Sequence, residues 1–293
     1  MFGRSETKHN AKYIRCIGDG DLKTFKGILD INPYNDNPVV EKKECVGHVK
    51  KRMGSRLRKA KKDNKGIGSK GAGKLTDKLI NELSLYYGLA IRRNPDSVKD
   101  MKRDVWATYF HKISTNENPQ HMNCSSSWCK YQKAIEDGTI DEFDHKNPPL
   151  NDKVLEVIKP IYESLSADSL LERCLGSETQ NNNESLNSLI WTFAPKHIHA
   201  GPKTIEIATF FAVSIFNEGF IPILKILDVM GITIGPEANA FAARGDEARI
   251  ERSELRTSEA SKEGRTARLH KRTSENEHFE VEEGFLYGAG IAD

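Results

Sequence analysis

The sequence contains no apolar run approaching the roughly 18 residues that suggest a membrane span. Its first residues, Met1-Phe2-Gly3-Arg4-Ser5, lack the basic start and apolar centre of a signal peptide. Cysteine is scarce: the five residues are odd in number and lack the even spacing of a disulfide framework. These absences favour an intracellular, reduced protein without a membrane partner, whose cysteines are thiols or metal ligands.

Positive charge is concentrated in one block. Of the 293 residues, those from 42 to 74 include thirteen Lys or Arg and two acids, a local net charge of +11 against +2 for the whole chain. Such a block is typical of proteins that bind DNA phosphates, and "KKRMGSRLRKAKK" also resembles a nuclear-localisation cluster. A solvated helix face is the alternative. We expect a nuclear protein with DNA contacts at Lys50, Lys51, Arg52, Arg56, Arg58, Lys59, Lys61 and Lys62.

Periodicity predicts a short α/β segment followed by helices. Residues 11–18 alternate like a strand, a helix reaches the Asn32-Pro33 break, and "PVVEKKEC" is a second candidate strand. A basic helix follows over 46–62, and "GIGSKGAGK" is typical of a flexible tether. Further helices are expected near 75–90, 101–113, 154–165, 203–217 and 221–230, with an irregular stretch at 116–130 and a charged helical or disordered tail after 236.

Two acids follow the first predicted strand. Asp19 and Asp21 are separated by one glycine in "IGDGDLKTF", a sequence that on its own suits a turn. Far downstream, "TQNNNESLNSLIW" places Glu184 at the start of a predicted helix, with Asn187 one turn later. A capping role at the positive end of the helix dipole is the alternative for Glu184.

Four separated motifs carry a family resemblance over about residues 11–235. They follow the Asp-Gly pair and are "ECVGHVKKRMGSRLRK", with Cys45 and His48 spaced C-x-x-H, then "YYGLAIRRN" and "STNENPQH", and finally "TQNNNESLNSLIW". In this order they resemble the Mutator-like transposases. The resemblance implies a ribonuclease-H-like core with an Asp-Asp-Glu triad, interrupted by a helical insertion, that cleaves and joins DNA using Mg²⁺ or Mn²⁺.

The resemblance also assigns roles. Asp19 matches the second acid of the triad, with Asp21 as the substitute, and Glu184 matches the third. Cys45, His48 and Asn187 belong to the family motifs. Two metal ions need carboxylates that hold them roughly 4 Å apart, and hard cations prefer oxygen ligands.

One family feature is missing from the sequence. The first acid normally lies on an earlier strand, but only about ten residues precede the strand before Asp19. We therefore expect an N-terminally truncated copy that binds DNA without cleaving it. A homo-oligomer is one option for its assembly. The alternative function is a non-catalytic DNA-binding or zinc-binding remnant; a cellular zinc-binding regulator is a third.

A separate motif suggests zinc. "HMNCSSSWC" supplies His121, Cys124 and Cys129 within nine residues, and a tetrahedral site needs a fourth ligand. His145 is the candidate for the fourth ligand and His111 is the alternative to it, while buried free thiols are the alternative to a metal site.

These expectations combine into an α/β protein with four segments. Residues 1–65 form the C-terminal half of a ribonuclease-H-like core, and residues 66–175 form the helical insertion with the zinc loop. Residues 176–235 return to the core with Glu184, and residues 236–293 form the charged tail.

Overall fold

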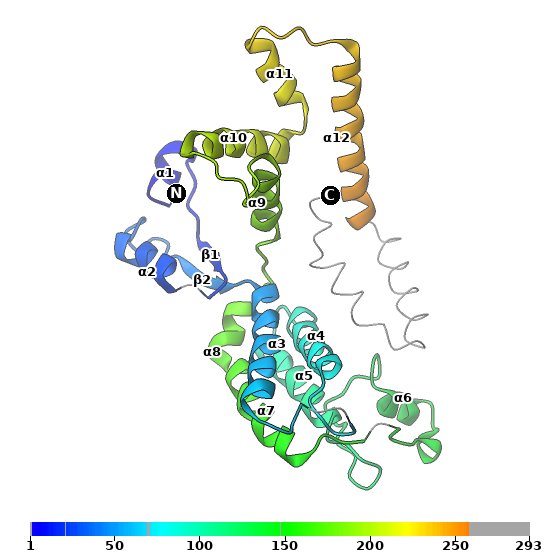
Figure 1. The fold of residues 1–293 in the computed structure, drawn as a ribbon. Helices are drawn as coiled ribbons and strands as arrows, with labels where there is room; N and C mark the ends of the chain where they lie inside the picture. Colours follow the sequence, from blue (N-terminus) through cyan, green and yellow to red (C-terminus); the bar gives the residue numbers. More distant parts are fainter. Residues whose placement is uncertain (1, 21, 69–70, 147, 258–293) are drawn as a thin grey trace. The chain divides into compact units, whose positions relative to one another are not determined.

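The computed structural model describes residues 2–20, 22–68, 71–146 and 148–257 of the chain. Asp21, the substitute for Asp19, and the end of the tail lie outside these residues. The chain divides into two compact units, residues 1–180 and residues 181–293. The described part is mostly helical, and its sheet has two strands (Figure 1).

The sheet is a small parallel pair near the start of unit 1. Strand β1 (Arg15–Gly18) lies beside β2 (Glu41–Glu44), with Arg15 opposite Glu41 and Gly18 opposite Glu44. Helix α2 (Leu22–Ile31) connects the strands, because parallel strands need a crossover. Ile28 of this helix forms a small buried cluster with Tyr34 and Val40. Phe2 of α1 (Phe2–His9) also packs against this cluster.

The main core lies between five helices of unit 1: α3 (Val46–Asp63), α4 (Asp77–Arg92), α5 (Val98–His111), α7 (Asp152–Leu165) and α8 (Asp168–Leu171). Helix α3 contributes Val46, Val49, Met53 and Leu57, which share one face and are 0–1% exposed. Several of its charged side chains are exposed, whereas Lys50 and Arg52 are half-buried. The basic sequence therefore belongs to an amphipathic helix that is anchored in the core.

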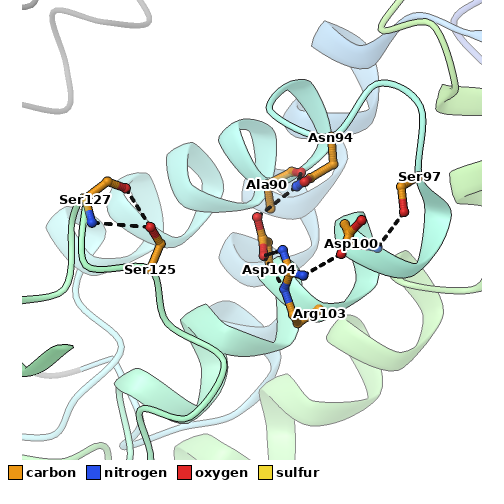
Figure 2. A network of polar contacts seen from close by, with 8 residues as sticks. All are labelled: Ala90, Asn94, Ser97, Asp100, Arg103, Asp104, Ser125 and Ser127. Carbon is orange, nitrogen blue, oxygen red and sulfur yellow. Dashed lines mark hydrogen bonds and ion pairs between the residues drawn. The ribbon is translucent and has the colours of Figure 1, made fainter.

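Side-chain caps fix the hairpin of α4 and α5. Ser97 caps α5 by accepting a hydrogen bond from the Asp100 amide at 3.2 Å. Asn94 donates to the Ala90 carbonyl and to Asp104, both at 2.8 Å, and Arg103 lies between Asp100 and Asp104 (Figure 2). These contacts set the position at which α5 begins, and therefore the place where its last residue, His111, comes to lie.

A long irregular segment joins α5 to α7. It contains α6 (Lys130–Glu136) and a 3-10 turn at Ile140–Glu142. Outside this segment, a second 3-10 turn at Glu172–Cys174 follows α8. The amide of Leu150 donates to the Lys112 carbonyl at 3.0 Å, so the two ends of the segment meet. The segment thus leaves the helical core after α5 and returns to it before α7.

Unit 2 consists of α9 (Asn181–Phe193), α10 (Pro202–Glu218), α11 (Ile221–Val229) and α12 (Pro236–Thr257). Asp246 on α12 accepts the Phe220 amide at 2.9 Å at the start of α11. The first part of the predicted helical or disordered tail is thus helical to Thr257. None of the described helices has the length and hydropathy to span a membrane.

Candidate functional site

Asp19 lies at the carboxyl end of β1, in a tight connection to α2. Its side chain is exposed, while its backbone carbonyl accepts a hydrogen bond from Arg52 Nη2 at 2.8 Å. Gly20 has φ +99°, and a Cβ there would lie 2.5 Å from Arg52 Nη2. Glycine is therefore required at this position for both backbone conformation and space.

The arginine beside Asp19 is held by a buried carboxylate. Glu44, the last residue of β2, is 2% exposed and lies 2.6 Å from Arg52 Nη2 and 3.3 Å from Arg173 Nε. Two guanidinium groups thus compensate one desolvated charge. Sequence reasoning placed Arg52 among the DNA contacts and missed Glu44, whose only signal was an acid inside the basic block.

The C-x-x-H residues flank the start of α3. Cys45 immediately precedes the helix and is 2% exposed, and His48 lies in its first turn, half-buried. Neither belongs to a group of three or more metal-type donors among the described residues. This pair is consequently a separate feature from the zinc-type cluster.

Four metal-type donors converge where α5 ends and α6 begins. His111 is the last residue of α5, Cys129 immediately precedes α6, and His121 and Cys124 come from the loop between them. One donor atom from each lies within 4.8 Å of all the others. The structure thus brings together the three residues of "HMNCSSSWC", and the fourth member of the group is His111 rather than His145.

The spacing of these donors suits a tetrahedral ion. The two Nδ1 atoms of His111 and His121 lie 3.1 Å apart. The sulfurs of Cys124 and Cys129 lie 3.5–3.8 Å from these nitrogens. Zinc bonds of about 2.0–2.1 Å to nitrogen and about 2.3 Å to sulfur give tetrahedral edges of roughly 3.3–3.8 Å. The sulfur–nitrogen distances fall in this range and the nitrogen pair is slightly closer, so the donor cage has about the size that Zn²⁺ requires.

The thiols of this cage are electrostatically coupled. A hydrogen bond from Cys124 lowers the pKa of Cys129, and the imidazoles of His111 and His121 add to the effect. The same hydrogen bond, with burial, raises the pKa of Cys124. One thiolate is thus favoured before any ion binds, and a dication supplies the charge that favours the second.

Aromatic rings close the cage. Tyr131 stacks on His121 with ring centroids 4.4 Å apart, and Trp128 packs against His111 at 5.1 Å and against Tyr86 of α4 at 5.6 Å. His121 and Cys129 are 2% and 1% exposed. Four protein donors in a buried cage are typical of structural rather than catalytic zinc sites.

The expected DNA-contact residues of α3 have different surroundings. Lys51, Arg58 and Lys62, at positions that share one helical face, are exposed, as is Lys59. Lys61 lies 2.9 Å from Asp77, Arg56 donates to Ser164 at 2.8 Å and Arg58 donates to Asn81 at 2.7 Å. The exposed face of α3 is therefore strongly cationic.

Lys50 is half-buried at the crossing of α3 and α4. A Cβ at Gly88 would lie 2.9 Å from Lys50 Cγ and 3.4 Å from Arg92 Nη2. The side chains of Lys50 and Arg92 therefore both lie against Gly88. Burial, and then the charges of Arg92 and Lys51, lower the pKa of Lys50 to about 8.

Glu184 and Asn187 lie in unit 2, on α9. Glu184 is in the first turn of the helix and Asn187 follows one turn later, and both side chains are exposed. Asp19 lies in unit 1. The pairing of Asp19 with Glu184 in one active site stays a prediction.

A family model named Mutator-like transposase matches residues 1–129. Over these residues the chain is similar to the Mutator-like transposases. The matched part contains Asp19, the C-x-x-H pair, the cationic helix α3 and all four donors of the cage, and ends at Cys129. No curated protein and no solved structure matches the chain.

Proposed function

We propose that the chain is a transposase-derived DNA-binding protein of the Mutator-like type. The match over residues 1–129 is the observation that supports this function most strongly. The exposed cations of α3 lie in the matched part and supply a chemically suitable surface for phosphates. Binding to DNA and the nuclear localisation suggested by the same basic sequence are both parts of this proposal.

The family's chemistry supports a role for the carboxylates. Asp19 follows a strand of a parallel pair, as in a ribonuclease-H-like core, which we propose as the underlying fold. Asp19 and Glu184 would hold divalent ions that activate a nucleophile and stabilise a leaving oxygen. The motifs supply only these two acids within the described residues, so we propose that the chain alone binds DNA without cleaving it.

Substitution of the exposed lysines tests DNA binding. The triple variant Lys51→Ala, Lys59→Ala, Lys62→Ala removes three charges from α3, and we expect its affinity for duplex DNA to fall at least tenfold. The control Lys133→Ala, Lys153→Ala, Lys159→Ala removes the same charge from other exposed positions. Equal affinities of the two variants would refute binding through α3.

We also propose that the four-donor cage binds one structural Zn²⁺. The convergence of His111, His121, Cys124 and Cys129 at tetrahedral spacing supports this proposal. It also favours the alternative function, a non-catalytic DNA-binding or zinc-binding remnant, because a structural zinc site takes no part in catalysis. Metal analysis of the purified chain should give about one zinc per chain.

Cysteine variants locate the zinc. Cys124→Ser and Cys129→Ser should abolish the bound metal, whereas Cys16→Ser, at a thiol outside the cage, should retain it. Loss of zinc in Cys45→Ser or His48→Ala, with retention in the cage variants, would move the site to the C-x-x-H pair.

A further inference from the structure

His121 has close polar contacts on both sides of its ring. Its Nδ1 faces the donor cage, 3.5 Å from the sulfur of Cys129. Its Nε2 faces away from the cage and lies 2.8 Å from His145 Nε2 and 2.8 Å from the Ser114 hydroxyl. The contacts of Nε2 therefore determine which form of the ring is presented to the cage.

Proton placement in this chain of contacts is set by chemistry. An imidazole that binds a metal through Nδ1 carries its remaining proton on Nε2, so His121 must donate from Nε2. His145 then accepts at its Nε2 and carries its own proton on Nδ1. That Nδ1 lies 2.6 Å from Asn116 Oδ1, an atom that can only accept.

The surrounding hydrogen bonds agree with protons on His121 Nε2 and His145 Nδ1. Asn116 Oδ1 also accepts the backbone amide of His145 at 2.9 Å, which fixes the amide so that its oxygen faces the ring. Ser114 is 3% exposed, its hydroxyl accepts the Gln120 amide at 2.8 Å, and it lies 3.2 Å from His145 Nε2. The Ser114 hydroxyl can thus accept a hydrogen bond from the Nε2 proton of His121 and donate its own proton to His145 Nε2.

We propose that His145 is a positioning residue of the zinc site, which holds His121 in the tautomer that binds metal through Nδ1. The proposal rests on the zinc site proposed above. His145 lies 24 positions after His121 in the sequence, so this contact also fastens the end of the irregular segment to the metal cage. The rings of His145 and His121 are nearly parallel, with centroids 5.1 Å apart, and Phe143 and Tyr131 pack against the ring of His145.

The expected loss of zinc affinity follows from the positioning role of His145. Removing an outer hydrogen-bond partner of a metal-binding histidine typically lowers metal affinity by 10–100-fold, whereas removing a ligand abolishes a tetrahedral site. His145→Phe should therefore keep one zinc per chain at saturating metal while its affinity falls about 10–100-fold. His145→Gln keeps an acceptor for His121 and should restore most of the affinity.

The experiment measures zinc affinity of the full chain by competition with a chromophoric chelator. It compares the wild type with His145→Phe, His145→Gln and the control His9→Phe, at an exposed histidine outside the site. Asn116→Leu tests the next contact, because it removes the acceptor of the His145 Nδ1 proton and should weaken zinc binding. Visible spectra of the Co²⁺-loaded proteins report the ligand set.

The outcomes separate this inference from the zinc site itself. A tenfold or greater loss in His145→Phe, rescue by His145→Gln and an unchanged Co²⁺ ligand spectrum would support positioning. Wild-type affinity in His145→Phe would overturn the positioning role and leave the zinc site intact. Complete loss of stoichiometric metal in His145→Phe would make His145 a ligand and also overturn it. A wild-type chain that binds no zinc would overturn the zinc site.

Discussion

Arg52 Nη2 lies 2.6 Å from the buried carboxylate of Glu44 and 2.8 Å from the backbone carbonyl of Asp19. One guanidinium thus joins the end of β2 to the loop that carries the candidate catalytic acid. This arrangement gives Arg52 a structural role in addition to its positive charge. The two roles can be separated by measuring folding and DNA binding independently.

Glu44→Ala should destabilise unit 1. The substitution leaves the partly exposed Arg52 and Arg173 without their shared carboxylate, and losing such charge-assisted hydrogen bonds typically costs about 1–3 kcal/mol. Urea unfolding followed by circular dichroism measures the loss. Glu41→Ala, at an exposed position of the same strand, is the matched control and should change stability by less than about 0.5 kcal/mol.

Chelation should loosen the segment between α5 and α7. Removing a structural zinc from a Cys₂His₂ cage leaves two buried thiols and two imidazoles in close contact. Thermal unfolding should begin at a lower temperature after chelation and recover when Zn²⁺ is added back. An identical melting curve for metal-loaded and chelated protein would show that the cage carries no structural metal.

DNA affinity should weaken as the pH rises from 7 to 9 because of Lys50. The pKa of Lys50 is lowered to about 8, so the ammonium is charged below that pH and loses its proton above it. Burial is the main cause of this lowered pKa, and the positive charges of Arg92 and Lys51 add to it. Lys50→Arg stays charged and should lack the pH dependence; if this variant weakens as steeply as the wild type, Lys50 is not the titrating group.

The chain alone should neither nick nor join DNA with Mg²⁺ or Mn²⁺. Asp19 and Glu184 are too few carboxylates to hold two metal ions about 4 Å apart against their mutual repulsion. Supercoiled plasmid incubated with the protein therefore stays supercoiled on a gel. Cleavage that disappears in Glu184→Gln would contradict this expectation and show that the chain holds a complete active site.

Much of the fold follows from local sequence patterns. Alternating residues and helical spacing predicted β1, α2, β2 and the basic helix α3, because a strand pair and an amphipathic helix are encoded in short windows. Helix α1 was not predicted, since its apolar content is slight and Phe2 is secured by the small cluster beside β1. The ribonuclease-H-like core stays a prediction.

Contacts between distant segments explain what sequence reasoning could not predict. The three donors in "HMNCSSSWC" are close in sequence, but the fourth depends on where α5 ends, and sequence reasoning favoured His145 over His111. Helix geometry selects His111, and His145 contacts the outer nitrogen of His121 instead. The partner of Glu44 at Arg173 is 129 positions away and has no local signal.

The salt dependence of DNA binding tests the central claim most directly. With a random-sequence duplex and the full chain, the logarithm of the binding constant should fall linearly with the logarithm of salt concentration. Several lysine and arginine contacts to phosphate predict a loss on the order of a thousandfold between about 50 and 200 mM salt. An affinity that is independent of salt over this range, or no binding at the lower concentration, would contradict the account of this protein as an electrostatic DNA binder.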